Sequence, residues 1–301
     1  MYDIEWFKNR ISCPVPSIST AFKENGDMDF AGISNQIEMS IENGAKSILL
    51  TYGDSLFTIL KDDEIIELNR FVIEQVRKRT MVIASGNCWP TVAAVEFATR
   101  VKAQGADLLI ALSPNWAAST NPETIYQHYK AIGQVMPAMA MTSMPSGGPL
   151  PLKTVEKLLD DKQSGLVAVK DDVCGLYGRR LGILINGRCA FLSGGLKMNY
   201  MDQVLYGADG YLSGFNRFRP DISKKFWKFK QDGNTEECMK IIKTMEIPFF
   251  IDLPEKLGLE FDCVIHAAME IYGICGRWRR NPYQNATEEQ KEKIREFLAG
   301  F

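Results

Sequence analysis

A single lysine, Lys170, stands at the end of an apolar run whose composition is typical of a buried β-strand. An ammonium group at that position would be partly removed from water, and desolvation favours the neutral amine. A neutral lysine amine attacks carbonyl carbon and forms a Schiff base. Position alone leaves an alternative open, an ordinary salt bridge to Asp171, Asp172 or Asp54.

Small and polar residues follow the other apolar runs of the chain, where they could surround a substrate held at Lys170. Two of them are candidates for assisting the chemistry, namely Thr142 and Tyr52. The candidates for substrate contact are Thr51, Gly53, Asp54, Trp116, Ser193, Leu212 and Ser213.

Eight apolar runs alternate with amphipathic stretches, a pattern that predicts parallel strands joined by helices. The predicted strands are residues 13–20, 47–52, 81–85, 108–113, 138–143, 166–170, 189–193 and 210–213. Predicted helices between them include residues 30–42, 62–78, 91–104, 122–134 and 152–160. Eight single strand–helix steps close into a (β/α)₈ TIM barrel, whose C-terminal strand ends form the active face. The Gly-x-Gly-x-x-Gly fingerprint of a dinucleotide-binding, doubly wound sheet is absent.

The chain is predicted to be a single domain with a barrel at residues 1–220 and a helical extension at residues 221–301. Helical patterns in the extension cover residues 222–231, 236–244, 262–272 and 288–298. No linker rich in Pro, Gly or Ser separates the two parts, so we expect the extension to pack on the barrel.

The charge balance argues against nucleic acid and membrane partners. The chain has 35 basic and 37 acidic residues, which gives a net charge of −2, and it contains no long run of either charge. The first ten residues alternate charged and aromatic types, unlike a signal peptide, and no apolar stretch approaches the roughly 20 residues of a membrane span. We therefore expect a cytoplasmic protein.

Cysteine and histidine usage argues against disulfides and metal sites. The seven cysteines are scattered without a Cys-x-x-Cys pair, which suits reduced thiols. The two histidines, His128 and His266, lie in segments with helical periodicity and form no zinc-binding pattern. We expect no metal and no cofactor.

Several motifs agree in order and spacing with one known family. The similarity lies in five parts of that family's sequence. They are the opening strand and its turn (residues 14–22 and 25–29), the start of the second helix (60–64), the lysine strand (165–171), the turn after the seventh strand (192–194) and the eighth strand (207–213). The chain thus resembles, over nearly its whole length, the dihydrodipicolinate synthase and N-acetylneuraminate lyase family of Schiff-base aldolases. The resemblance implies that Lys170 is the Schiff-base lysine, that no metal is needed, and that the chain forms a homotetramer or dimer.

Three elements of that family's site are replaced in this chain. The family binds a 2-keto acid carboxylate with a Gly-Thr-Thr-Gly-Glu turn, and residues 50–54 match it with Tyr52 in place of the second threonine. The family's proton-carrying tyrosine after the fifth strand corresponds to Thr142, and a nearby arginine corresponds to Gly147. These replacements argue against dihydrodipicolinate synthase itself.

Two hypotheses follow from these departures. The first is a lyase or aldolase that joins a small carbonyl substrate, a 2-keto acid or sugar-acid-like compound, to Lys170. An alkyl hydroxyl such as that of Thr142 cannot replace a phenol as acid and base, although it could hold a water or bond the carbinolamine. Thr142, Tyr52 and ordered water would together take the place of the family's tyrosine. Tyr52 could instead pack under its loop or narrow the pocket. The second hypothesis is a catalytically silent family member that binds a metabolite or a protein.

Overall fold

Eight parallel strands form one sheet in the computed structural model, which describes residues 2–115, 117–143 and 148–301. The strands are β1 Pro14–Val15, β2 Ser47–Leu49, β3 Met81–Ser85, β4 Leu108–Ala111, β5 Ala138–Met141, β6 Leu166–Asp171, β7 Ala190–Ser193 and β8 Gly210–Leu212. Their order in the sheet is β1-β8-β7-β6-β5-β4-β3-β2.

The two edges of this sheet meet and close it. Ser17, just after β1, pairs in parallel with Leu49 of β2. The Leu49 amide donates to the Pro16 carbonyl, and the Ile18 amide donates to the Leu49 carbonyl, both at 3.0 Å. The predicted (β/α)₈ barrel is therefore confirmed.

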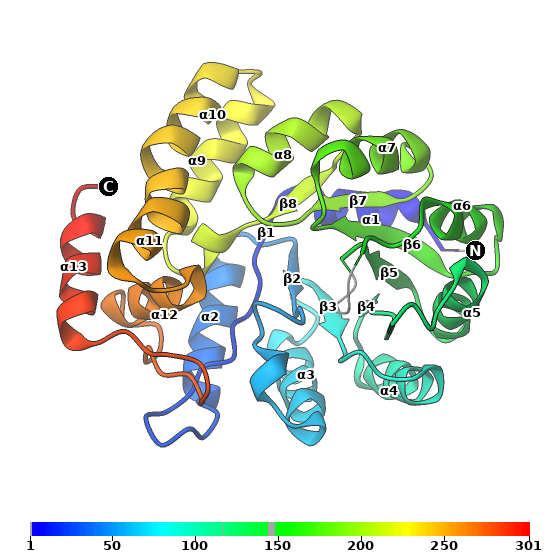
Figure 1. The fold of residues 1–301 in the computed structure, drawn as a ribbon, viewed down its shortest axis with the longest axis horizontal. Coiled ribbons are helices and arrows are strands. Elements are labelled where there is room, and N and C mark those ends of the chain that lie inside the picture. The colour runs from blue at the N-terminus through cyan, green and yellow to red at the C-terminus, as the bar shows by residue number, and fades with distance from the viewer. Residues whose placement is uncertain (1, 116, 144–147) are drawn as a thin grey trace.

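A helix follows each of the strands from β1 to β7 and covers the outside of the barrel (Figure 1). These helices are α2 Phe30–Glu42, α3 Asp62–Val76, α4 Thr91–Gln104, α5 Pro122–Gly133, α6 Leu152–Asp160, α7 Gly175–Ile185 and α8 Lys197–Gln203. The bounds of α2, α4 and α6 are those expected from the sequence.

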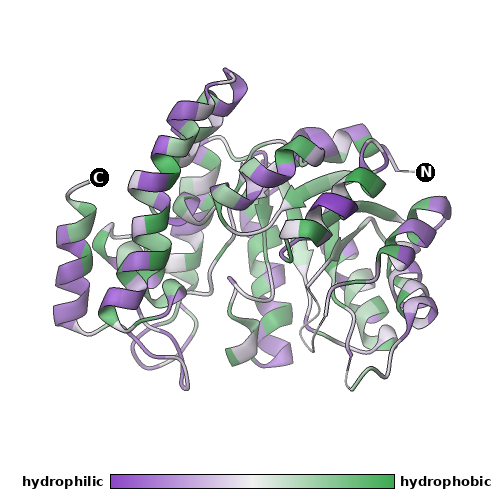
Figure 2. Cartoon of the chain, turned by 45° about the horizontal axis from the view of Figure 1, so that its top comes forward, coloured by the Kyte–Doolittle hydropathy of each residue, from purple (hydrophilic) through white to green (hydrophobic). Residues whose placement is uncertain are grey.

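Alternation along the strands separates two hydrophobic cores. In β6, for example, Ala168 belongs to the barrel interior, while Val169 belongs to the layer between strands and helices. Because successive side chains of a strand point to opposite faces, a strand contributes side chains to both cores. Figure 2 shows the result: the strands are mostly green, and the helices turn purple, polar sides outward.

The N-terminal segment was not predicted correctly. Residues Ile4–Ile11 form a helix, α1, whose Phe7 and Ile11 are buried against the barrel interior. The first strand, expected over residues 13–20, covers only Pro14–Val15. Beyond it, the Ser17 hydroxyl donates to Asp54 and the Thr20 hydroxyl donates to the Ser55 carbonyl. Side-chain hydrogen bonds therefore hold this stretch where a continuous ladder of backbone hydrogen bonds was expected.

The C-terminal extension stacks along one side of the barrel, coloured yellow to red in Figure 1. Its helices are α9 Pro220–Gln231, α10 Thr235–Ile241, α11 Leu253–Leu257, α12 Phe261–Ile271 and α13 Glu288–Leu298, with π-helical stretches Ile242–Glu246 and Pro248–Asp252 before α11. Polar contacts tie the extension to the barrel helices, including a hydrogen bond of 2.9 Å that the Asn35 side-chain amide donates to the Ile274 carbonyl. Within the described ranges, no helix combines the length and apolar character needed to cross a membrane.

Gly210 allows β8 to approach the chain that leads into β1. A Cβ atom at this position would lie 1.9 Å from the Ile11 carbonyl oxygen and 2.5 Å from that of Cys13. Gly210→Ala should therefore push β8 away from β1 and lower the free energy of unfolding by about 1–3 kcal/mol or more, as overpacking does. Urea unfolding measures this.

Gly300→Ala is the matched control, since the nearest atom to an added Cβ there is 3.4 Å away. Equal stability of the two variants would contradict the proposed role of Gly210 in barrel closure.

Candidate active site

A cavity of about 470 Å³ opens where the barrel strands end. It is lined by Thr51, Tyr52, Gly53, Asp54, Met141, Ser143, Lys170, Asp172, Gly195, Leu196, Leu212, Gly214, Arg217, Phe250 and Phe261. Six of the residues predicted from the sequence are among them: Lys170, Thr51, Tyr52, Gly53, Asp54 and Leu212. A second hollow of about 460 Å³ opens among Trp6, Lys46 and Met81, where strands begin and Lys170 does not reach.

Strand alternation carries Lys170 into the cavity. It shares the interior face of β6 with Ala168, two residues earlier. Its side chain is only 3 % exposed, and its Nζ atom lies 2.5 Å from both carboxylate oxygens of Asp172. Of the three salt-bridge partners left open by the sequence, Asp172 is the one in contact. Its side chain remains 28 % exposed, so it faces the cavity as well as the lysine.

Asp171 points the other way, into the layer between strands and helices. It is fully buried and accepts four hydrogen bonds. The donors are the Thr142 hydroxyl and the Gln203 amide, each at 2.5 Å, and the backbone amides of Val173 and Cys174 at 3.0 and 3.1 Å. The Thr142 hydroxyl also accepts from the Asp172 amide at 3.2 Å. Asp171 and Thr142 together fix the backbone that carries Asp172.

Three predicted site residues, Thr142, Ser193 and Ser213, are buried but do not line the cavity. Each follows an interior residue by one position, so alternation turns it outward toward the helices. Ser213, for instance, makes a 2.6 Å hydrogen bond with Ser223 of α9. The same alternation was available from the sequence, and it would have placed Met141 and Ser143 in the cavity in place of Thr142. That Thr142, Ser193 and Ser213 contact the substrate stays a prediction, and their position outside the cavity lining does not support it.

The turn after β2 forms a polar part of the wall. The Thr51 hydroxyl accepts from the Asp54 amide at 3.3 Å, and Asp54 accepts from the Ser17 hydroxyl at 2.6 Å. Burial raises the pKa of the half-buried Tyr52 phenol, with smaller contributions from Cys88 and Tyr283. The phenol is therefore protonated at neutral pH, and it has no hydrogen-bond partner among the described residues. Trp116 lies outside the described residues.

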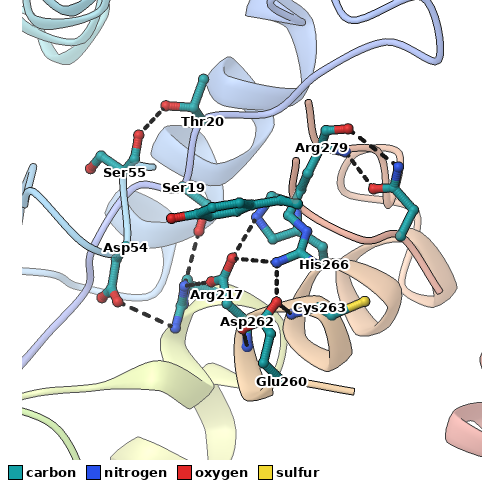
Figure 3. A network of polar contacts seen from close by, with 12 residues as sticks. Ser19, Thr20, Asp54, Ser55, Arg217, Glu260, Asp262, Cys263, His266 and Arg279 are labelled. Carbon is teal, nitrogen blue, oxygen red and sulfur yellow. Dashed lines mark hydrogen bonds and ion pairs between the residues drawn. The ribbon is translucent and has the colours of Figure 1, made fainter. Parts of the chain in front are cut away.

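Arg217 is a cavity residue that the sequence reasoning missed. It ends the 3₁₀ turn Gly214–Arg217 after β8, and its side chain is 3 % exposed. Its Nη1 atom donates to the Ser19 hydroxyl at 3.0 Å and to Asp262 of α12 at 3.2 Å, while Nη2 lies 3.9 Å from Asp54 (Figure 3). A basic residue just beyond a strand end was a visible signal for this place.

Behind Arg217 lies a buried polar network that joins the cavity wall to the extension (Figure 3). Asp262 also lies 3.4 Å from Arg279, which in turn pairs with Glu260. Burial raises the pKa of Asp262, although both guanidinium groups act to lower it. The network therefore balances buried cations with carboxylates and holds Arg217 in one orientation.

The extension also supplies an apolar part of the wall through Phe250 and Phe261. Gly214 makes room for Phe250, whose ring an added Cβ would meet at 2.7 Å. Glu246 accepts the amides of Lys197 and Met198 at 2.8 and 3.0 Å, which fixes the start of α8 beside Leu196. The barrel alone would leave this side of the cavity open.

A sequence model of the dihydrodipicolinate synthetase family matches residues 11–300. The chain belongs to this family. The match covers the barrel, the lysine strand and the extension, in agreement with the resemblance found in the motifs. Family members include lyases and aldolases that act on different compounds, so membership identifies a lyase-type enzyme family without its substrate.

Individual family members are only distantly similar to this chain. The 4-hydroxy-tetrahydrodipicolinate synthase of Acetivibrio thermocellus is 25 % identical over 95 % of both chains. N-acetylneuraminate lyase from Fusobacterium nucleatum has a TM-score of 0.84 at 16 % identity, covering 97 % of this chain and 99 % of that one. YagE from Escherichia coli K12, solved in complex with pyruvate, has a TM-score of 0.82 at 22 % identity, covering 95 % and 97 %. These structures show a shared fold.

The side chains that this family fold brings together at the cavity contain no metal-binding set. Among residues 2–115, 117–143 and 148–301, no three His, Cys, Asp or Glu side chains gather where they could hold a metal ion. All seven cysteines are free thiols. The acid–base groups that the cavity offers are Lys170, Asp172, Asp54 and Tyr52.

His266 of α12 should make stability depend on pH. It is fully buried next to this network, both ring nitrogens lack hydrogen-bond partners in the described structure, and burial lowers its pKa well below 6.5, helped by Arg279 and Arg217. Below about pH 6.5 the unfolded chain therefore binds a proton that the folded chain does not. The free energy of unfolding should fall with decreasing pH by up to about 1.4 kcal/mol per pH unit.

The comparison is wild type against His266→Leu in urea between pH 7.5 and 5. His128, whose pKa burial also lowers, is present in both proteins and cancels in the difference. The variant should show a shallower fall with pH, and parallel curves would contradict this account of His266.

Proposed function

We propose that this protein is a Schiff-base-forming lyase or aldolase that acts on a small carbonyl compound through Lys170. The observation that carries the proposal is a lysine amine, almost fully buried, at the base of the cavity and in contact with a carboxylate that also reaches the cavity. The neutral form of a lysine amine is the nucleophile toward carbonyl carbon, and the carboxylate in contact with it can accept its proton. Family membership supports the same chemistry.

The covalent adduct would do the catalytic work that a metal does in other lyases. A protonated imine withdraws electrons from the neighbouring carbon, so a carbon–carbon or carbon–oxygen bond one position away can break. The described cavity residues suffice for this route because it needs only an amine and acid–base groups. We propose no cofactor beyond Lys170 itself.

The polar turn supports a 2-keto acid as the substrate class. In the family that the motifs resemble, this turn binds the keto acid carboxylate, and here Thr51, Tyr52 and Gly53 line the cavity at the same place. Two similar structures, YagE and the Fusobacterium lyase, were solved with pyruvate. The rest of the substrate would then face the apolar wall formed by Phe250, Phe261 and Leu196. Assembly into a homo-oligomer in the cytoplasm stays a prediction.

One observation favours the second candidate, a catalytically silent binding protein. Thr142 corresponds to the family tyrosine, and its hydroxyl is fully engaged with Asp171 and the Asp172 amide. If Tyr52 and Asp172 supply no proton, carbonyl compounds would bind in the cavity without forming an adduct. Covalent trapping separates the two candidates.

Trapping should place a carbonyl adduct on Lys170. Borohydride reduction in the presence of pyruvate, followed by peptide mapping, should add the expected mass to Lys170, and Lys170→Ala should abolish it. Lys197 is an internal control: it is fully buried, and burial lowers its pKa, but it faces aromatic rings and Glu246 and does not line the cavity. Labelling that persists in Lys170→Ala, or that falls on Lys197, would contradict the assignment.

Dihydrodipicolinate synthase activity should be absent. The family's second turn threonine is Tyr52 and its tyrosine is Thr142, which points away from the cavity. Its arginine position is Gly147, which lies outside the described residues. A coupled assay with pyruvate and aspartate semialdehyde measures this activity, and turnover of about 1 s⁻¹ or more, the lower end of ordinary enzymes, would overturn the prediction.

A further inference from the structure

We infer that Asp172 is the general acid and base for Schiff-base formation at Lys170. The inference rests on the proposed function, since it assigns the proton transfers of that reaction. It names a group that motif comparison did not select, because the family's proton carrier is a tyrosine and the tyrosine's position here is Thr142. In this inference the proton-carrying group lies just after β6, the strand that bears the lysine.

Contact and access support this assignment. Asp172 is the one carboxylate in the described structure within hydrogen-bond distance of the Lys170 amine, at 2.5 Å, and it also lines the cavity. Its backbone amide is held by Thr142. Gly194 leaves room for its carboxylate, since an added Cβ there would lie 1.8 Å from Oδ1. The carboxylate is therefore placed between the nucleophile and the space for the carbonyl group.

The other acid–base groups of the site are less suited. Asp171 already accepts four hydrogen bonds on the outer face of the strand. Asp54 is bound by Ser17 and faces Arg217. The Tyr52 phenol has a raised pKa and makes no hydrogen bond to Lys170 in the described structure.

The proton transfers balance with Asp172 alone. The carboxylate first takes a proton from the Lys170 ammonium, and the nitrogen lone pair then forms a bond to the carbonyl carbon while the C=O π pair moves to oxygen. Asp172 gives its proton to that oxygen and takes one from nitrogen, which yields the neutral carbinolamine. It then protonates the hydroxyl, the C–O bond breaks, and water leaves. The products are water, a protonated imine and the Asp172 carboxylate beside that cation.

Two reagents separate acid–base catalysis from simple anchoring of the lysine. Pyruvate with borohydride reports imine formation, which needs proton transfer to oxygen, whereas fluorodinitrobenzene arylates any free amine. Asp172→Asn should slow the trapped adduct on Lys170 by about 10²–10⁴, the usual contribution of a general acid or base. Arylation of Lys170 should stay as fast or become faster, because losing the carboxylate destabilises the ammonium form.

Rescue and a matched control complete the test. Asp172→Ala should regain adduct formation at least tenfold when formate is added, and Asp172→Glu should retain part of the rate. Asp202→Asn is the control: it removes a carboxylate that pairs with Arg179 on the surface, and it should react like the wild type. Urea midpoints of all variants establish that they are folded.

Gly194→Ala provides a second test of Asp172, in which the Lys170 amine and the Asp172 carboxylate are both kept. The added methyl group would displace the Asp172 carboxylate, so adduct formation should slow at least tenfold while arylation of Lys170 persists.

The outcomes distinguish the two proposals. Adduct formation in Asp172→Asn at nearly the wild-type rate overturns the inference and leaves the proposed function intact. An equal loss of adduct formation and arylation shows that Asp172 only anchors the lysine, which also overturns it. A wild type that forms no adduct with pyruvate or butyraldehyde overturns the proposed function together with the inference.

Discussion

A buried ammonium group needs a counter-charge, and this requirement shapes the whole site around Lys170. The lysine is 3 % exposed, so its cation would be costly without Asp172 at 2.5 Å. The same contact gives the amine a nearby base. Everything that fixes Asp172 then serves both purposes: Thr142 holds its backbone amide, Asp171 holds Thr142, and Gly194 leaves the space that its carboxylate fills.

A strand can place neighbouring residues on opposite faces, and the site uses this to separate chemistry from support. Lys170 faces the barrel interior, whereas Asp171 faces the helices and binds Gln203 and the start of α7. The extension supports the opposite side of the cavity. Arg217 is held by Ser19, Asp54 and Asp262, and the apolar wall comes from Phe250 and Phe261. The cavity is therefore lined by both the barrel and the extension, and the barrel supplies Lys170.

The fold was largely predictable because its signals are local. Buried parallel strands are continuous apolar runs, and all eight were found, with three of the outer helices at their observed bounds. Lys170 was found for the same reason, as a charge at the end of such a run. Three further residues, Thr142, Ser193 and Ser213, were expected at the site because strand ends were inspected without regard to which face each side chain takes. In the structure they are buried and do not line the cavity. Arg217 carried a local signal that was overlooked, a basic residue just beyond a strand end, although its orientation depends on Asp262 of α12. Phe250 could not be placed from the sequence, since its position depends on a π-helical stretch distant along the chain.

A crystal structure of the protein reduced with borohydride in the presence of pyruvate would show directly whether Lys170 forms the Schiff base. We expect continuous electron density from the Lys170 Nζ atom to the second carbon of the reduced pyruvate, its carboxylate near residues 51–53, and Asp172 beside the new C–N bond. Pyruvate bound without a covalent bond while Lys170 remains paired with Asp172, or a bond to any other lysine, would contradict it.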